Sequence, residues 1–209
     1  MSDEIIPAQI YLATPRAFDP HEFAPRLQAV LSLAPVVCVR LSLASTEERE
    51  LTRAADTLRE VCHNADVAFV VDDHFRMVQP LGLDGVHLTD GSRHVREARE
   101  MLGQDAIVGA YCEGSRHAGM TAAEIGTDYI SFGPIADTGT LGSGAVAETE
   151  LFRWWSQMIE VPLVAEGNAT LEGVKGIKDY IDFLTLGDEI WNAEDGAEAA
   201  VKRFMQALE

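Results

Sequence analysis

The chain has 209 residues and a formal net charge of -18 at pH 7. This length fits one large α/β domain and no linker-like stretch interrupts it, so we expect a single domain over residues 1–209. The acidic balance disfavours nucleic acid and anionic membranes as partners, because both require a basic surface. The acidic start of the chain is unlike a secretory signal and no apolar run approaches a membrane span, which together predict a soluble, cytoplasmic protein.

Short apolar runs of β-favouring residues alternate with longer amphipathic segments, and we count eight such pairs. The predicted strands are 9–13, 36–41, 67–71, 85–88, 107–110, 129–132, 163–165 and 183–186. Several of these runs are apolar throughout rather than alternating. Such runs are typical of a parallel sheet that is covered on both faces.

Amphipathic segments between the strands predict the helices. They lie at about 21–33, 93–102, 116–125, 149–158, 171–180 and 196–208, with another that begins near Ser45. Ser45 and Glu48 have the spacing of a capping box, in which each side chain satisfies a free backbone N–H of the first turn. The apolar stripe that follows, from Leu51 to Cys62, has the three-to-four spacing of one buried helix face.

Eight β–α pairs in about 200 residues favour a single (β/α)8 barrel, the TIM-barrel fold of the α/β class. A faint repeat supports this regularity, because an aspartate precedes three of the strands, at Asp84, Asp128 and Asp182. The alternative is a doubly wound open sheet. That fold would place a glycine-rich, nucleotide-binding turn after the first strand, and residues 14–17 contain no glycine.

The strand at 129–132 leads into a loop rich in glycine and threonine. Gly133 and Pro134 end the strand, since proline cannot continue a ladder of hydrogen bonds. Residues 137–144 combine hydroxyls, small side chains and accessible backbone N–H groups, a composition expected of a loop around an oxyanion. A polar connection without a ligand is the equally open alternative.

The active site of a (β/α)8 barrel lies at the carboxyl ends of its strands. The residues expected there are Arg40, Asp72, Asp73, His87, Asp90, Glu113, Thr138, Thr140, Glu166, Gly167, Gly187 and Asp188. Carboxylates that converge from several strands can hold Mg²⁺, which takes oxygen ligands and bridges to substrate phosphates. The alternative is that they are solvated loop carboxylates of an acidic protein.

Two of these side chains have specific alternatives. Arg40 ends an apolar strand, where a buried guanidinium binds a carboxylate or a phosphate, and pairing with a neighbouring aspartate is as plausible as a ligand. His87 lies within a strand, which favours a hydrogen-bonded core histidine over a catalyst.

Scarce residue types limit the chemistry further. The three lysines all fall in predicted helices rather than at strand ends, which argues against a Schiff-base aldolase: Lys175, Lys178 and Lys202.

The three cysteines are widely spaced and predict small core residues rather than disulfides or a zinc site: Cys38, Cys62 and Cys112. The three tryptophans are expected to pack within helices or loops, and a homodimer surface is the alternative: Trp154, Trp155 and Trp191.

The chain resembles the thiamine phosphate synthase and thiazole tautomerase (TenI-like) family of (β/α)8 barrels over nearly its whole length. The resemblance rests on VCVRLSL, VVDDHF, LDGVHL, GTDYISFGPI with its Thr-x-Thr loop, and the late PLVAEG. It implies a transferase of thiamine biosynthesis that joins a pyrimidine pyrophosphate to a thiazole phosphate. Mg²⁺ and basic groups would stabilise the departing pyrophosphate.

Residue by residue, the resemblance is partial. It implies a catalytic role for Arg40 and Mg²⁺ on Asp73, with Asp90 in place of a second metal-binding aspartate that falls on Ser92. Substrate or phosphate would be bound by Arg40, Asp72, His87, Thr138, Thr140, Gly167 and Gly187. Two lysines of the family pattern fall on Ser42 and Leu141, and the acid–base histidine of the tautomerase falls on Glu113.

Three functions therefore remain open. The first is a synthase-like barrel that binds small phosphorylated metabolites with Mg²⁺. The second is a tautomerase-like isomerase with Glu113 as acid and base, which a raised carboxyl pKa would permit. The third is a metabolite-binding relative without catalysis that has lost the phosphate-binding lysines, since one barrel fold hosts many functions.

Overall fold

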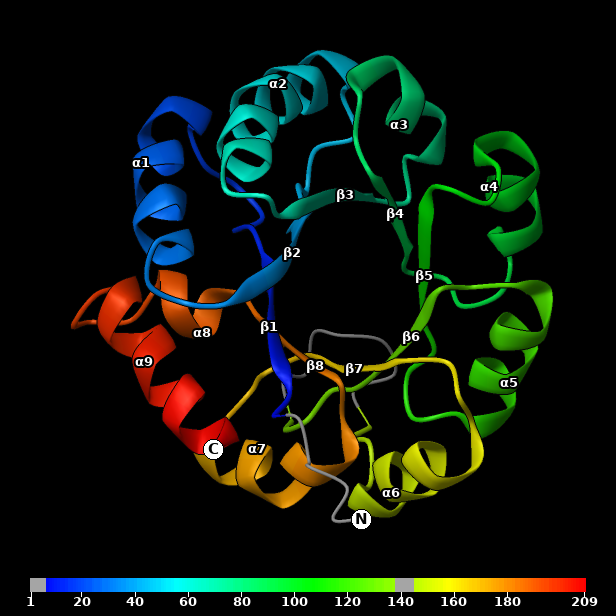
Figure 1. The fold of residues 1–209 in the computed structure, drawn as a ribbon. Helices are drawn as coiled ribbons and strands as arrows, with labels where there is room; N and C mark the ends of the chain where they lie inside the picture. The colour runs from blue at the N-terminus through cyan, green and yellow to red at the C-terminus, as the bar shows by residue number, and fades with distance from the viewer. Residues whose placement is uncertain (1–6, 138–144) are drawn as a thin grey trace.

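The computed structural model describes residues 7–137 and 145–209. In this part of the chain eight parallel strands close into a barrel in the order β1 to β8, and β8 pairs with β1. The strands are β1 (Gln9–Ala13), β2 (Val36–Leu41), β3 (Ala68–Asp72), β4 (Gly85–Leu88), β5 (Ile107–Tyr111), β6 (Tyr129–Phe132), β7 (Leu163–Ala165) and β8 (Phe183–Leu186). Figure 1 shows the helices surrounding this barrel. The predicted (β/α)8 barrel is confirmed.

The helices follow the strands along the chain. They are α1 (Pro20–Leu31), α2 (Glu48–Asn64), α3 (Phe75–Leu81), α4 (Val95–Leu102), α5 (Arg116–Ile125), α6 (Thr149–Met158), α7 (Leu171–Ile177), the 3₁₀ turn η1 (Lys178–Tyr180), α8 (Asp188–Trp191) and α9 (Ala197–Leu208). Each helix covers the outside of the barrel or its rim (Figure 1). None of these helices, which span the described residues only, is long and apolar enough to cross a membrane.

The sequence predictions were incomplete for three helices. α3 and α8 were not predicted, because both are short and α3 contains Pro80. The predicted capping box was wrong: α2 begins at Glu48, and its N-cap Glu47 makes no side-chain cap bond. Ser45 instead accepts a hydrogen bond from the backbone N–H of Glu47 at 3.2 Å, which shapes the turn before the helix.

The repeated aspartate before alternate strands holds neighbouring strands in register. Each carboxylate accepts a hydrogen bond from a backbone N–H of the preceding strand: Asp84 from Phe69 at 2.6 Å, Asp128 from Val108 at 2.7 Å and Asp182 from Leu163 at 2.8 Å. These contacts lie at the N-terminal ends of β4, β6 and β8, opposite the expected active site. The repeat is therefore structural, as expected for that end of a barrel.

The core has two layers. Outward strand residues pack against the helices in one large cluster, which includes Trp155 and Trp191. Inside the barrel, Tyr11, Val70, Tyr129 and Val164 form a second, smaller cluster. The predicted packing of Trp155 and Trp191 is confirmed, and so is that of the cysteines, which are buried or half-buried and free.

Candidate active site

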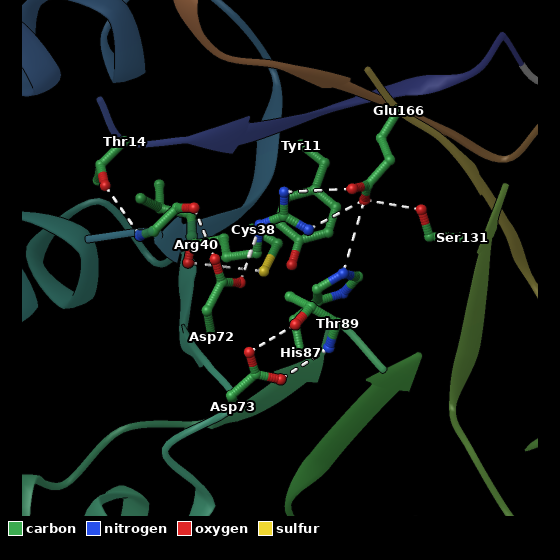
Figure 2. A network of polar contacts seen from close by, with 12 residues as sticks. Tyr11, Thr14, Cys38, Arg40, Asp72, Asp73, His87, Thr89, Ser131 and Glu166 are labelled. Carbon is green, nitrogen blue, oxygen red and sulfur yellow. Dashed lines mark hydrogen bonds and ion pairs between the residues drawn. The ribbon is translucent and has the colours of Figure 1, made fainter. Parts of the chain in front are cut away.

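The central feature of the barrel mouth is an ion pair between Arg40, at the end of β2, and Glu166, which directly follows β7. The Arg40 Nη1 lies 2.9 Å from Glu166 Oε2, and Nη2 lies 3.4 Å from Oε1. Arg40 is 7% exposed and Glu166 3% exposed. The Ser131 hydroxyl donates a second hydrogen bond to Glu166 Oε2 at 2.7 Å (Figure 2). The guanidinium therefore has a carboxylate partner before any ligand binds.

Electrostatics keep this pair charged. Burial would raise the pKa of Glu166, but the Arg40 guanidinium and the Ser131 hydroxyl outweigh burial and hold the pKa below its usual range. Burial would lower the pKa of Arg40, and the facing carboxylates of Glu166 and Asp72 raise it instead. The mouth thus contains a fixed, buried cation between two carboxyl groups.

Asp72 lies on the other side of Arg40. Its Oδ1 is 3.3 Å from Arg40 Nε, an ion-pair distance without the alignment of a hydrogen bond. The Ser42 hydroxyl donates to Asp72 Oδ2 at 2.6 Å, and the Ser42 N–H donates to the Thr14 hydroxyl at 3.0 Å. Burial raises the pKa of Asp72 above its usual range in spite of Arg40 and Ser42. The alternative that Arg40 pairs with a neighbouring aspartate is thus realised, although Glu166 is its hydrogen-bonded partner.

His87 lies beneath this cluster, inside the barrel. It is fully buried, and its Nδ1 is 2.8 Å from the hydroxyl of Tyr129, which is in turn 2.8 Å from the hydroxyl of Tyr11. Burial and the nearby Arg40 lower the pKa of His87 to about 3. The imidazole is consequently neutral at pH 7, which supports its role as a hydrogen-bonded core histidine.

A cavity of about 560 Å³ opens beside Arg40 at the C-terminal ends of β1, β2, β7 and β8. It is lined by Ala13, Arg40, Asp137, Glu166, Gly167, Asn168, Thr185, Gly187, Asp188 and Glu189. Three residues predicted for substrate binding meet here: Arg40, Gly167 and Gly187. Its lining also brings four carboxylates together, so the cavity has a strongly acidic wall.

Glu189 and Thr185 are among the lining residues of this cavity that were not predicted. The Glu189 carboxylate accepts hydrogen bonds from the backbone N–H groups of Ala169 at 2.9 Å and Gly187 at 2.7 Å. Thr185 is 4% exposed, and its hydroxyl has no hydrogen-bond partner among the described residues. Thr185 could have been found from the alternation of strand residues, because it lies two positions before Gly187 on the same side of β8.

The predicted metal residues line a second cavity, of about 450 Å³, near the ends of β3 and β4. Asp73 accepts hydrogen bonds from the Thr89 N–H at 2.7 Å and the Thr89 hydroxyl at 2.6 Å (Figure 2). Asp90 pairs with His94 Nδ1 at 2.7 Å. Among the described residues no three His, Cys, Asp or Glu side chains form a ready metal cluster. Two carboxylates at one cavity nevertheless suit Mg²⁺, which completes its shell with water and substrate phosphates.

The remaining predicted residues lie elsewhere. Glu113 follows β5 with an exposed side chain and a positive φ of 51°, and it lines neither of these two cavities. Thr138, Thr140 and Leu141 lie outside the described residues. The structure therefore brings together Arg40, Gly167 and Gly187 in one cavity and Asp73 and Asp90 in another. Three other predicted residues line neither of these two cavities: Asp72, His87 and Glu113.

Fold and site define a (β/α)8-barrel protein whose polar pockets open at the C-terminal ends of the strands. The family model described as thiamine monophosphate synthase matches residues 10–181, and the chain belongs to this family. The predicted resemblance is thereby confirmed.

Full-length relatives agree with this assignment. The thiamine-phosphate synthase of Rhodospirillum centenum is 40% identical over 201 residues, covering 96% of this chain and 97% of that protein. The thiamine-phosphate synthase of Erythrobacter litoralis is 35% identical over 214 residues, covering 100% of this chain and 99% of that protein. A solved thiamine phosphate pyrophosphorylase from Pyrococcus furiosus superposes with a TM-score of 0.79 at 22% identity, covering 96% and 95% of the two chains, and shows the shared fold.

Proposed function

We propose that this protein is a thiamine-phosphate synthase that joins a pyrimidine pyrophosphate to a thiazole phosphate. One observation carries the proposal: Arg40, Gly167 and Gly187, which the family resemblance assigns to substrate binding, line a single cavity at the catalytic end of the barrel. The match to full-length synthases over nearly the entire chain supports it.

The proposed reaction exchanges one bond for another. The bond from the pyrimidine to its pyrophosphate breaks, and the electron pair leaves with the pyrophosphate. The thiazole nitrogen supplies the electron pair for the new carbon–nitrogen bond. Such a dissociative step needs charge neutralisation on the leaving group more than proton transfer, so the enzyme's main task is to orient both substrates and stabilise negative charge.

Arg40 is the cationic side chain of the first cavity, the only one among the described lining residues. Glu166 and Asp72 hold the guanidinium of Arg40 on two sides. We infer that this keeps the guanidinium in one position, from which it orients a bound oxyanion. Asp73 and Asp90 would hold Mg²⁺, which supplies the remaining neutralisation of the pyrophosphate when it is bound.

The family resemblance implies two lysines at positions where this chain has other residues, and we infer that other groups supply part of the charge neutralisation. Ser42 stands at one of the two positions and donates its hydroxyl to Asp72 at 2.6 Å. The other position, Leu141, is apolar. With fewer ammonium groups at the mouth, we infer that catalysis in this chain depends more on the metal and on backbone N–H donors.

A direct assay tests the proposal. Purified protein is incubated with the pyrimidine pyrophosphate, the thiazole phosphate and Mg²⁺, and thiamine phosphate and pyrophosphate are followed together. Equal release of both products, lost in Asp73→Ala, is the expected result. If neither product forms while each substrate still raises the melting temperature, the protein is a metabolite-binding relative without catalysis and the proposal is wrong.

A further inference from the structure

The Glu189 carboxylate is held by backbone groups from two separate loops. Its Oε1 accepts the N–H of Ala169, in the loop after β7, and its Oε2 accepts the N–H of Gly187, directly after β8, at 2.9 Å and 2.7 Å. Two oxygens of one anion thus satisfy two N–H groups that come from two different loops. This is the arrangement by which converging backbone N–H groups bind an oxyanion.

This contact lies in a part of the barrel that often binds phosphate. In (β/α)8 barrels the loops after strands seven and eight frequently form a phosphate site. Ala169 and Gly187 belong to those two loops, and Gly187 and Glu189 line the cavity beside Arg40. The Glu189 side chain therefore occupies two backbone N–H groups at this cavity: that of Gly187, which lines it, and that of Ala169, the neighbour of the lining residue Asn168.

A second observation points to a ligand in the same cavity. Thr185 lies in its wall and is only 4% exposed. Its hydroxyl has no hydrogen-bond partner among the described residues. A buried hydroxyl without a partner costs about 1–3 kcal/mol. A ligand atom that bonds to Thr185 would remove this cost.

We propose that Glu189 is an internal competitor for the phosphate of the substrate. The phosphate binds the N–H groups of Ala169 and Gly187 only after the Glu189 carboxylate has moved away from them, so Glu189 sets the affinity and specificity of the site for anions. The inference rests on the proposed function in one respect, which is that the substrate places a phosphate in this cavity.

Calorimetry with inorganic phosphate tests this on the full chain. Glu189→Ala frees both N–H donors and removes one negative charge, and we expect it to bind phosphate at least tenfold more tightly than the wild type. Asp188→Asn is the matched control, because it removes one charge from the same cavity and leaves both donors occupied. We expect a change of less than threefold for this control.

Glu189→Gln provides a second test if Glu189→Ala does not fold. It is nearly isosteric, but its amide offers one acceptor where the carboxylate offered two, so it should also bind phosphate more tightly than Asp188→Asn. Equal affinity in the wild type and both Glu189 variants would overturn the proposal. So would an increase in Asp188→Asn as large as in Glu189→Ala, because charge alone would then explain the effect.

The wild-type coupling assay separates this inference from the proposed function. Product formation by the wild type together with unchanged phosphate affinity in the Glu189 variants would leave the synthase assignment intact and remove the competitor role. Tighter phosphate binding in Glu189→Ala, combined with a wild type that forms no product, would support the competitor role and reject the synthase assignment.

Discussion

Arg40 and Glu166 are 126 residues apart in the sequence, and their side chains meet in a buried ion pair at 2.9 Å. The pair joins β2 to the end of β7 across the mouth of the barrel (Figure 2). It has both a structural and a functional consequence, because removing either charge leaves the other buried and also changes the cavity in which we place the substrate.

Disrupting this pair should destabilise the protein more than disrupting a surface pair. We expect Arg40→Met to lower the free energy of unfolding by about 3–5 kcal/mol, because Glu166 and Asp72 would remain as buried carboxyl groups. Adding Glu166→Gln should restore part of that loss. Urea denaturation of the four proteins of this double-mutant cycle gives the coupling energy.

The exposed pair of Arg76 and Glu97 serves as the control for this cycle. Its side chains are 72% and 47% exposed and lie 2.7 Å apart, so its coupling should be about 0–1 kcal/mol. A coupling between Arg40 and Glu166 that is no larger than this value would contradict the importance we give to their burial.

His87 should make the protein sensitive to acid. Its pKa is lowered to about 3 by burial and by Arg40, whereas in the unfolded chain a histidine titrates near about 6.5. Between these values the unfolded state binds a proton that the folded state does not. Neutral His87 therefore makes its whole contribution to the free energy of unfolding above about pH 6.5. As the pH falls from there toward about 3, the free energy of unfolding decreases by about 1.4 kcal/mol per pH unit.

Glutamine in place of His87 cannot titrate, so His87→Gln should flatten this part of the stability profile. The free energy of unfolding would be measured by urea denaturation at several values between about pH 4.5 and about pH 7.5. The slope is compared rather than the absolute stability, because the variant also alters the contact with Tyr129. His21→Gln, at an exposed position, is the control. Equal slopes in the wild type and His87→Gln would refute the prediction.

Thr185 and Thr127 allow a test of ligand contact at matched positions. Both are buried, at 4% and 7% exposure, and neither hydroxyl has a hydrogen-bond partner among the described residues. Valine at either position should leave the melting temperature unchanged or raise it, because an unsatisfied buried hydroxyl is removed.

Substrate affinity should distinguish the two variants. Thr185 lines the cavity beside Arg40, whereas Thr127 precedes β6 at the other end of the barrel. We expect Thr185→Val to raise the KM for the thiazole phosphate roughly fivefold, the equivalent of losing one hydrogen bond of about 1 kcal/mol. Thr127→Val should leave KM unchanged. Unchanged KM in both variants would remove Thr185 from the binding site.

Asp73 should determine the magnesium requirement of the reaction. Thr89→Val would remove a partner that orients the carboxylate and should raise the half-saturating Mg²⁺ concentration by roughly tenfold. Asp73→Asn should raise it further or abolish activity, because the carboxylate itself is lost. Mg²⁺ titrations of product formation measure both effects. Asp105→Asn, exposed and before β5, controls for the loss of one charge, and an Asp73→Asn titration identical to it would exclude Asp73 as a ligand.

Most of the fold could be predicted from the sequence because its signals are local. Seven of the helices and all eight strands follow from apolar runs and helical periodicity, with bounds that differ from the structure by at most a few residues. α3 and α8 were missed because four- to seven-residue helices carry too little periodicity to be distinguished from loops. The capping box failed because hydrogen bonding of Ser45 to the nearby turn competed with the cap.

The partners within the site could not be predicted in the same way. Strand ends are set by local chain preferences, so Arg40, Asp72, Glu166 and Gly187 could be placed there from the residues alone. The contacts of Glu166 with Arg40, of Ser42 with Asp72, and of Glu189 with the N–H groups of Ala169 and Gly187 became visible only in the folded barrel. Such contacts depend on how strands distant in the chain are arranged around a closed barrel, and no local pattern of residues encodes that geometry.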